Sequence, residues 1–106
     1  MRHICVVKPA LPRRQLRSTV SLFAALAHPM RLHVLVALHR TGPMSAGDLQ
    51  RIVKVEQSAL SHQLAALRRA RLVAAERNGR QVIYCLADHH VAHIVEDGLK
   101  HAMERS

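Results

Sequence analysis

Residues 45–73 read SAGDLQRIVKVEQSALSHQLAALRRARLV, and no other part of the chain is as informative about the fold. The apolar residues in it follow two helical patterns, with a short break near Lys54 and Val55. Ser45, with Asp48 three residues later, resembles a capping box and predicts the start of the first helix. Two short helices joined by a tight turn are typical of a helix-turn-helix.

The second of these helices is predicted to have one apolar and one polar face. The apolar stripe consists of Leu60, Leu64 and Leu67. The outward side chains are Gln57, Ser58, Ser61, His62 and Arg68. The first four are short or hydrogen-bonding, so we expect them to face the major groove of DNA. His62 lies beside Ser61 but has no plausible acid partner, so the sequence does not predict an enzyme.

A hairpin is predicted directly after the helix-turn-helix, in LVAAERNGRQVIYCL, residues 72–86. Asn78-Gly79 separates two runs of β-prone residues, which is the strongest short-range signal for a two-residue hairpin turn. Arg77 and Arg80 flank the tip of this hairpin. A basic hairpin in this place is typical of a wing, and its arginines are predicted to contact phosphates or the minor groove.

The preceding part of the chain predicts an arm and two further helices. Residues 1–14 carry Pro9 and Pro12 among basic residues and are predicted to be an N-terminal arm, with one domain over residues 15–106. Apolar residues recur at helical spacing from Gln15 onward. Pro29 then predicts the first turn of a second helix in HPMRLHVLVALHR, which TGP ends.

Composition limits the class of protein. The chain has 106 residues, which suffices for one compact domain, and only Phe23 and Tyr84 are aromatic, so packed helices are favoured. The net charge is +9 and no acidic residue precedes Asp48, which indicates a polyanionic partner such as double-stranded DNA. Cys5 and Cys85 form no metal-knuckle pair, and no apolar run approaches a membrane span, so a cytoplasmic protein without a membrane partner is expected.

Three segments together carry a resemblance to a known family: ALAHPMRLHVLVAL at residues 25–38, the stretch at 45–73, and RNGRQVIYCL at 77–86. They are similar to the ArsR/SmtB family of bacterial winged-helix, metal-sensing repressors, over about residues 18–104. The resemblance implies a mainly α fold with a small β-hairpin, and a homodimer formed through the N- and C-terminal helices. The cysteine motif of the arsenic, cadmium and lead sensors of that family is absent from SAGDLQRIV. Cys5 and Cys85 also do not match the cysteine pair of its redox sensors.

The last segment, DHHVAHIVEDGLKHAMERS at residues 88–106, holds four of the nine histidines. On a helical wheel the stripe to be buried consists of Val91, Ile94, Val95, Gly98, Leu99 and Ala102. His89 and His93 fall on the opposite side and are predicted to be solvated. His90, His101 and Glu104 lie together on one flank of the apolar stripe.

One helix cannot bring His90 and His101 to one metal ion, because eleven residues span about 16 Å along the axis. A second copy packed antiparallel can do so. The pair His90 and His101 is centred on nearly the same point of the helix as the pair Asp88 and Glu104. The packing that joins His90 to His101 of a second copy therefore also joins Asp88 to its Glu104.

Two imidazoles and two carboxylates suit a tetrahedral ion such as Zn(II), so a metal site of Asp88, His90, His101 and Glu104 is predicted. The pattern is similar to the terminal-helix site of the family's zinc sensors. Ni(II) or Co(II) are alternatives, because sensors of those ions use related ligands and add others. The additional candidates here are His3, Cys5, His93 and Asp97. A plain structural interpretation also exists, in which Asp88 caps the helix and the other three are solvated.

The sequence thus predicts a dimeric repressor that binds operator DNA when metal-free and is released by Zn(II). One alternative is a winged-helix regulator that responds to a redox or organic signal without a metal site. Another is a nucleoid or RNA-binding module that senses nothing. Metal titration distinguishes the first from the other two.

Overall fold

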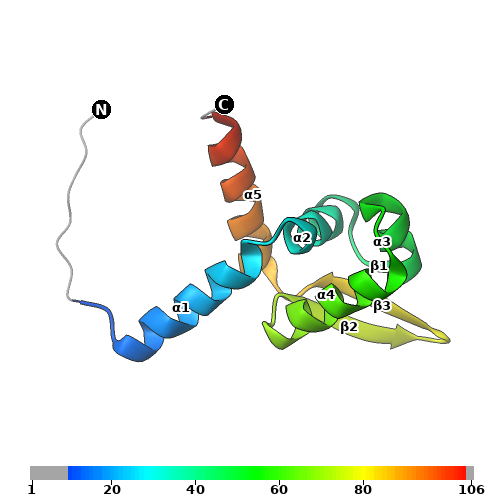
Figure 1. The fold of residues 1–106 in the computed structure, drawn as a ribbon, viewed down its shortest axis with the longest axis horizontal. Helices are drawn as coiled ribbons and strands as arrows, with labels where there is room; N and C mark the ends of the chain where they lie inside the picture. Colours follow the sequence, from blue (N-terminus) through cyan, green and yellow to red (C-terminus); the bar gives the residue numbers. More distant parts are fainter. Residues whose placement is uncertain (1–9, 105–106) are drawn as a thin grey trace.

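The computed structural model describes residues 10–104, which form five helices and three strands (Figure 1). The elements are α1 (Arg13–Leu26), α2 (Pro29–Thr41), β1 (Met44–Ser45), α3 (Ala46–Val53), α4 (Gln57–Arg69), β2 (Val73–Asn78), β3 (Gln81–Leu86) and α5 (His89–Glu104). Helices α2, α3 and α4 pack together beside the small sheet. The two terminal helices project from this winged body, so the mainly α, winged helix-turn-helix fold predicted from the sequence is confirmed.

Helix α2 begins and ends where the sequence predicts. Pro29 occupies the first turn, and the His28 ring accepts a hydrogen bond from the Arg31 amide at 3.4 Å. The helix ends before Gly42, whose φ of 97° is accessible to glycine at little cost. The TGP stop is therefore confirmed.

The helix-turn-helix is fixed by local hydrogen bonds. The Ser45 hydroxyl accepts from the Asp48 amide at 3.2 Å and caps α3, as the capping-box pattern predicts. Lys54 ends α3 in the left-handed conformation, at φ 60°. The Gln50 side-chain amide then donates to the Val55 carbonyl at 3.1 Å, which satisfies a backbone group of the turn.

The sheet differs from the predicted hairpin in two respects. It has a third strand, β1, which pairs antiparallel with β3 through Met44 and Tyr84. The two-residue loop is Gly79-Arg80 rather than Asn78-Gly79, because Asn78 pairs with Gln81 and so ends strand β2. Gly79 has φ 66°, which places the glycine at the first loop position, as in a type II′ turn.

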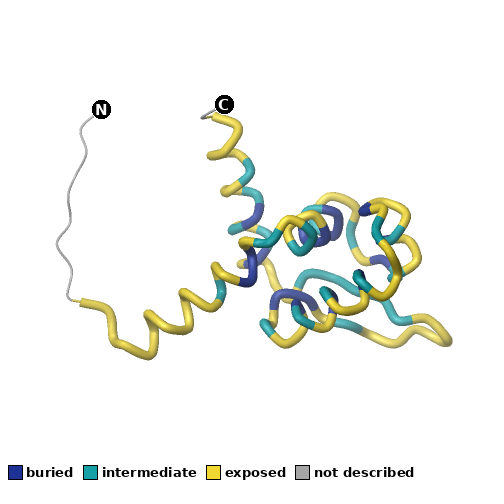
Figure 2. Tube along the Cα trace, viewed as in Figure 1, coloured by how far each residue is buried: buried dark blue, intermediate teal, exposed yellow. Residues whose placement is uncertain are grey.

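The core of the winged body consists of aliphatic side chains from every helix and from the sheet (Figure 2). The stripe Leu60, Leu64 and Leu67 of α4 is buried, at 1%, 2% and 0% exposure, and packs with Leu35 and Leu49. The side chain of α2 residue Arg31 donates from Nε to Gln63 Oε1 of α4 at 2.7 Å. These contacts orient α4 within one chain.

The terminal helices are less covered than the body (Figure 2). Helix α1 begins at Arg13, and only Ala25 and Leu26 near its C-terminus are buried. On α5 only Val91 and Val95 of the predicted stripe are buried, whereas Gly98 and Ala102 are exposed. Full burial of that stripe was expected and is not found in a single chain, because α5 extends past the body that would cover it.

No single helix within residues 10–104 is long and apolar enough to cross a membrane. The pair α1 and α2 reaches the required length and hydropathy only when taken together, and it is bent by 86°.

Candidate DNA-binding surface and metal site

Helix α4 presents its polar face to solvent. Gln57, Ser58, Ser61 and His62 are all exposed, which agrees with the outward orientation predicted for them. Their role in reading DNA stays a prediction. Exposure and a rigid leucine-anchored helix are the two geometric conditions for contact with base edges.

The start of α4 depends on Glu56, a residue that the sequence did not single out. Its carboxylate accepts from the Ala59 amide at 3.3 Å and from the Ser58 hydroxyl, and so caps the helix. The same carboxylate therefore holds the Ser58 side chain at the N-terminus of the recognition helix. Glutamate is an uncommon N-cap, which explains why the pattern was missed.

The wing carries the two predicted arginines. Arg77 lies in β2 opposite Val82, and Arg80 lies in the loop itself rather than beside it. Both side chains are exposed. The hairpin thus presents two guanidinium groups near its tip, and their contact with phosphate or the minor groove stays a prediction.

Two of the predicted metal ligands are neighbours at the start of α5. Asp88 Oδ1 accepts from the Val91 amide at 3.1 Å, so Asp88 is the N-cap of the helix. The same Oδ1 lies 3.6 Å from His90 Nδ1. Two ligands at 2.0–2.2 Å from a tetrahedral ion are about 3.3–3.6 Å apart, so this pair fits half of such a site.

The other two predicted ligands lie in the last turn of α5. His101 and Glu104 are three residues apart and therefore neighbours on the helix surface, and both are exposed. Across residues 10–104 of one chain, no three His, Cys, Asp or Glu side chains are grouped closely enough to hold a metal ion. The structure brings Asp88 and His90 together and does not bring them to His101 or Glu104 within a chain.

The remaining histidines of α5 and the additional ligand candidate on that helix are exposed to solvent. His89 and His93 are exposed as predicted, and the His89 ring lies 4.2 Å from that of His90, measured between centroids. Asp97 is also exposed. His3 and Cys5 lie outside the described residues. Cys85 lies half-buried in β3 and is free.

A side-chain hydrogen bond that the sequence did not reveal connects α5 to the body. His39 Nε2 of α2 lies 2.9 Å from Glu96 Oε1, and both side chains are partly buried. Lys100 is 3.9 Å from the second oxygen of Glu96. No periodicity predicts a contact between residues 57 positions apart, so it required the tertiary structure.

Helix α4, the turn before it and the basic hairpin after it define a winged-helix DNA-binding protein. Residues 28–75 match the family model described as bacterial regulatory protein, arsR family. The chain is 44% identical to the HTH-type transcriptional regulator NmtR of Mycobacterium tuberculosis over 82 residues, which cover 77% of this chain and 68% of that protein. It is 40% identical to the HTH-type transcriptional repressor SmtB of the same species over 101 residues, which cover 94% and 74%.

A solved structure shows the same fold. The homodimeric winged helix-turn-helix DNA-binding domain Mb0332 of Mycobacterium bovis, a possible ArsR-family regulator, matches with a TM-score of 0.81 and 25% identity, over 92% of this chain and 93% of that one. The chain belongs to the ArsR family of bacterial regulatory proteins. It is accordingly a DNA-binding transcriptional repressor and not an enzyme.

Proposed function

We propose that this protein is a homodimeric repressor that binds its operator in the metal-free state and releases it when Zn(II) binds between the terminal helices of two chains. The observation that carries the proposal is that the four predicted metal ligands lie as two pairs, one at each end of α5. Asp88 and His90 are adjacent at one end, and His101 and Glu104 share a face at the other. In a dimer whose α5 helices pack antiparallel, each end of one helix would lie beside the opposite end of the other. Two equivalent metal sites would result.

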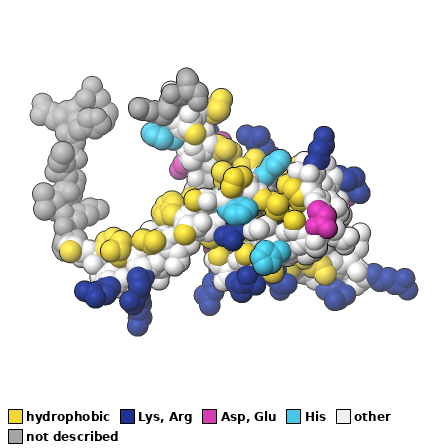
Figure 3. Space-filling model, viewed as in Figure 1, with side chains coloured by type: hydrophobic (Ala, Val, Ile, Leu, Met, Phe, Trp, Pro, Cys, Tyr) yellow, Lys and Arg dark blue, Asp and Glu magenta, His cyan; other side chains and the backbone are white. Residues whose placement is uncertain are grey.

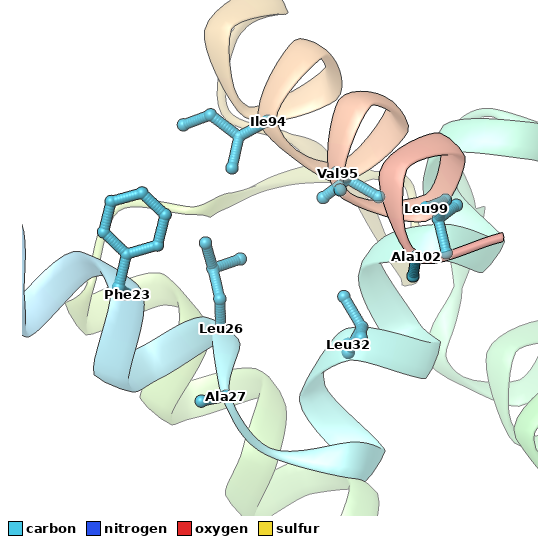
Figure 4. A pocket seen from close by; sticks show the side chains of 9 residues that line it. Phe23, Leu26, Ala27, Leu32, Ile94, Val95, Leu99 and Ala102 are labelled. Carbon is cyan, nitrogen blue, oxygen red and sulfur yellow. The ribbon is translucent and has the colours of Figure 1, made fainter. Parts of the chain in front are cut away.

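The surface that we propose for the dimer is an apolar groove between α1, α2 and α5 (Figure 4). Its volume is about 320 Å³, and the side chains that line it include Phe23, Leu26, Leu32, Ile94 and Leu99. Along α1 the groove continues into exposed apolar side chains, with Val20 at 58% and Phe23 at 53% exposure. Continuous exposed apolar surface is typical of an interaction site, and a second copy presenting the same face would cover it.

The dimer proposal has a direct test. Replacing Phe23 with glutamate places a charge in the groove, so sedimentation should show monomers at concentrations at which the native protein is dimeric. Arg40→Glu, at an exposed position of α2 outside the groove, is the control and should leave the dimer intact. A Phe23→Glu protein that remains dimeric would contradict this interface.

The residues that would hold Zn(II) are Asp88 and His90 of one chain with His101 and Glu104 of the other. This donor set of two imidazole nitrogens and two carboxylates fits the ion, and Ni(II) or Co(II) could be held by the same residues. The ion would supply the free energy that favours one dimer geometry. Because operator DNA would favour another, each ligand lowers the affinity for the other by the same factor.

The remaining parts of the proposal concern DNA. Gln57, Ser58, Ser61 and His62 would read base edges, whereas Arg77 and Arg80 would bind phosphates or the minor groove of the operator. Removing both arginines should reduce affinity for every sequence and flatten its salt dependence, without changing specificity. We place this regulator in the cytoplasm, where operator DNA is accessible.

Metal-dependent release of the DNA upstream of the protein's own gene is the decisive experiment. Fluorescence anisotropy of that duplex should show binding by the metal-free protein and release on adding Zn(II), with Ni(II) and Co(II) as comparisons. The His101→Ala protein should bind the duplex as the native protein does and stay bound when Zn(II) is added. Release that persists in this variant would exclude the proposed site, and a duplex that no metal releases would favour the redox or organic signal.

A further inference from the structure

Helix α1 has a basic face that neither the recognition helix nor the wing explains. Its positively charged side chains are Arg13, Arg14 and Arg17, all exposed. The first turn contains no acidic residue, and Pro12 at the N-cap provides no side-chain hydrogen bond. Cations at a helix N-terminus are unfavourable because they face the positive end of the helix dipole. An anionic partner at this position would relieve that repulsion.

The basic face of α1 is directed toward the C-terminal end of α4. Ser18, Ser21 and Leu22 line a hollow of about 250 Å³ together with Ala70, the C-cap of α4. Arg14, Ser18 and Ser21 are spaced i, i+4 and i+7, so they share one stripe of α1. Arg17 lies one turn before Ser21. Arg14 and Arg17 are therefore on or next to the side of the helix that faces the end of α4. Arg13 is seven residues before Val20 and lies beside the apolar stripe instead.

Three more arginines lie at that end of α4: Arg68, Arg69 and Arg71, all exposed. Arg71 has φ 61°, and the turn closes with bonds from its amide to the Arg68 carbonyl and from the Leu72 amide to the Leu67 carbonyl, both about 3 Å. This is a Schellman turn, in which the left-handed position is usually glycine. An arginine at this position costs free energy relative to glycine, and its side chain is held at the end of α4.

We refer to these six exposed arginines of α1 and of the C-terminal end of α4 together as the α1–α4 basic surface. Neither α1 nor α4 contains an acidic residue, and within residues 10–104 none of the six guanidinium groups forms an ion pair. In Figure 3 the basic side chains of α1 lie at its lower edge, opposite its apolar ones, and further basic side chains follow the same lower edge under the winged body.

We propose that the α1–α4 basic surface binds DNA phosphates beyond the region covered by the recognition helix and the wing. This inference rests on the proposed function, because it assumes that the partner is DNA. It adds α1 to the proposed DNA-binding surface. The apolar and basic faces of α1 then have different partners. Guanidinium groups bind phosphate oxygens through paired hydrogen bonds, and bonds of this kind position a protein on DNA without reading its sequence.

The test uses the metal-free, full-length protein and a random-sequence duplex longer than the stretch that the two α4 helices and two wings of a dimer would cover. Affinity is measured by anisotropy over a series of salt concentrations. Arg14→Gln with Arg17→Gln should make the slope of log K against log salt less negative by about 0.9 for each phosphate that is no longer bound. At low salt the affinity should fall by about tenfold or more.

Two controls separate this result from general charge or folding effects. Arg40→Gln with Lys100→Gln removes the same charge from exposed positions outside the surface and should leave the slope unchanged. Arg14→Lys with Arg17→Lys keeps the charge and should bind nearly as tightly as the native protein. Equal slopes for the two Gln variants would overturn the proposal.

Arg71→Gly tests the same surface in the opposite direction. Glycine relieves the left-handed strain, so the protein should be at least as stable to heat while its DNA affinity falls severalfold. Unchanged DNA affinity would remove Arg71 from the surface. Metal-driven release from the operator should survive in all these variants, so a failure of the sensing proposal and a failure of this one are distinguishable.

Discussion

Helices α4 and α5 are of similar length, yet their surroundings differ. Three leucines of α4 are fully buried by the rest of the same chain, and Arg31 fixes Gln63 on its flank. On α5 only Val91 and Val95 are buried, and the C-terminal half of its apolar stripe lines a groove that is open on one side. The helix that we propose reads DNA is complete in one chain, whereas the proposed sensor helix is half of the proposed interface.

If α5 acts as proposed, this difference allows one fold to serve both DNA binding and regulation. A recognition helix must be rigid to read base edges, so it is anchored in the core. A sensor helix must have two arrangements that a ligand can distinguish, so its partner is best supplied by another subunit. His39 and Glu96 connect α5 to α2, and α2 is bonded to α4 through Arg31.

The largest effect is expected in the core under α4. Leu64→Ala should lower the free energy of unfolding by about 2–5 kcal/mol, because it leaves a cavity at a side chain that is 2% exposed. Urea denaturation at fixed protein concentration measures this decrease. Ser61→Ala, on the outer face of the same helix, should change stability by only about 0.5 kcal/mol or less. Similar decreases in both variants would mean that α4 is not anchored by its leucines.

The next effect concerns α5 and tests whether each metal site takes ligands from both chains. A forced heterodimer of His90→Ala with His101→Ala removes both imidazoles from one site and leaves the second site with all four ligands. It should bind about one Zn(II) tightly, whereas the zinc affinity of a His90→Ala homodimer should fall by more than the roughly 10–100-fold that an outer-sphere partner costs. Calorimetric titration counts the ions, and equal binding by both dimers would contradict the shared site.

Binding to this site should also depend on acidity. Since the ligand form of histidine is the neutral imidazole, zinc competes with protons, and the affinity should fall as the solution is acidified. The same titration repeated over a pH series provides the measurement. Affinity that does not change would mean that histidines are not the ligands.

A smaller effect is expected on the outer face of α4. Replacing Ser61 and His62 together with alanine should weaken operator binding by about 1–3 kcal/mol for each base edge that is no longer read. Binding to random DNA should change far less, because the phosphates remain bound. If the ratio of operator to random affinity is unchanged in anisotropy measurements, these residues do not read the sequence.

The smallest effect separates the two roles of Asp88. Asp88→Ala should cost the metal-free protein about 1 kcal/mol, because the Val91 amide loses its cap, whereas Asp88→Asn keeps that bond and should cost only a few tenths. Both variants should bind Zn(II) more weakly if the carboxylate is a ligand. An Asn variant with native zinc affinity would leave Asp88 as a cap alone.

Much of the fold was predictable because its signals are local. The proline at the start of α2, the Ser45 cap and the leucine period of α4 each act within a few residues, so they could be recognised without knowing the rest of the chain. The short strand β1 was missed, since two residues carry no period and pair only with a strand almost 40 positions later. The hairpin loop was displaced by one residue, because an Asn-Gly pair does not determine which of its residues ends the strand.

The winged helix-turn-helix, the polar face of α4 and the spacing of Asp88, His90, His101 and Glu104 follow from the order of residues along one chain, without reference to distant contacts. Which part of each apolar face stays open depends instead on how the helices pack. The stripe on α5 has the same period along its whole length, yet it is covered only where α5 crosses the body. Tertiary packing also brings His39 to Glu96 and α1 to the end of α4. Local sequence could not predict these contacts, because the residues are far apart along the chain.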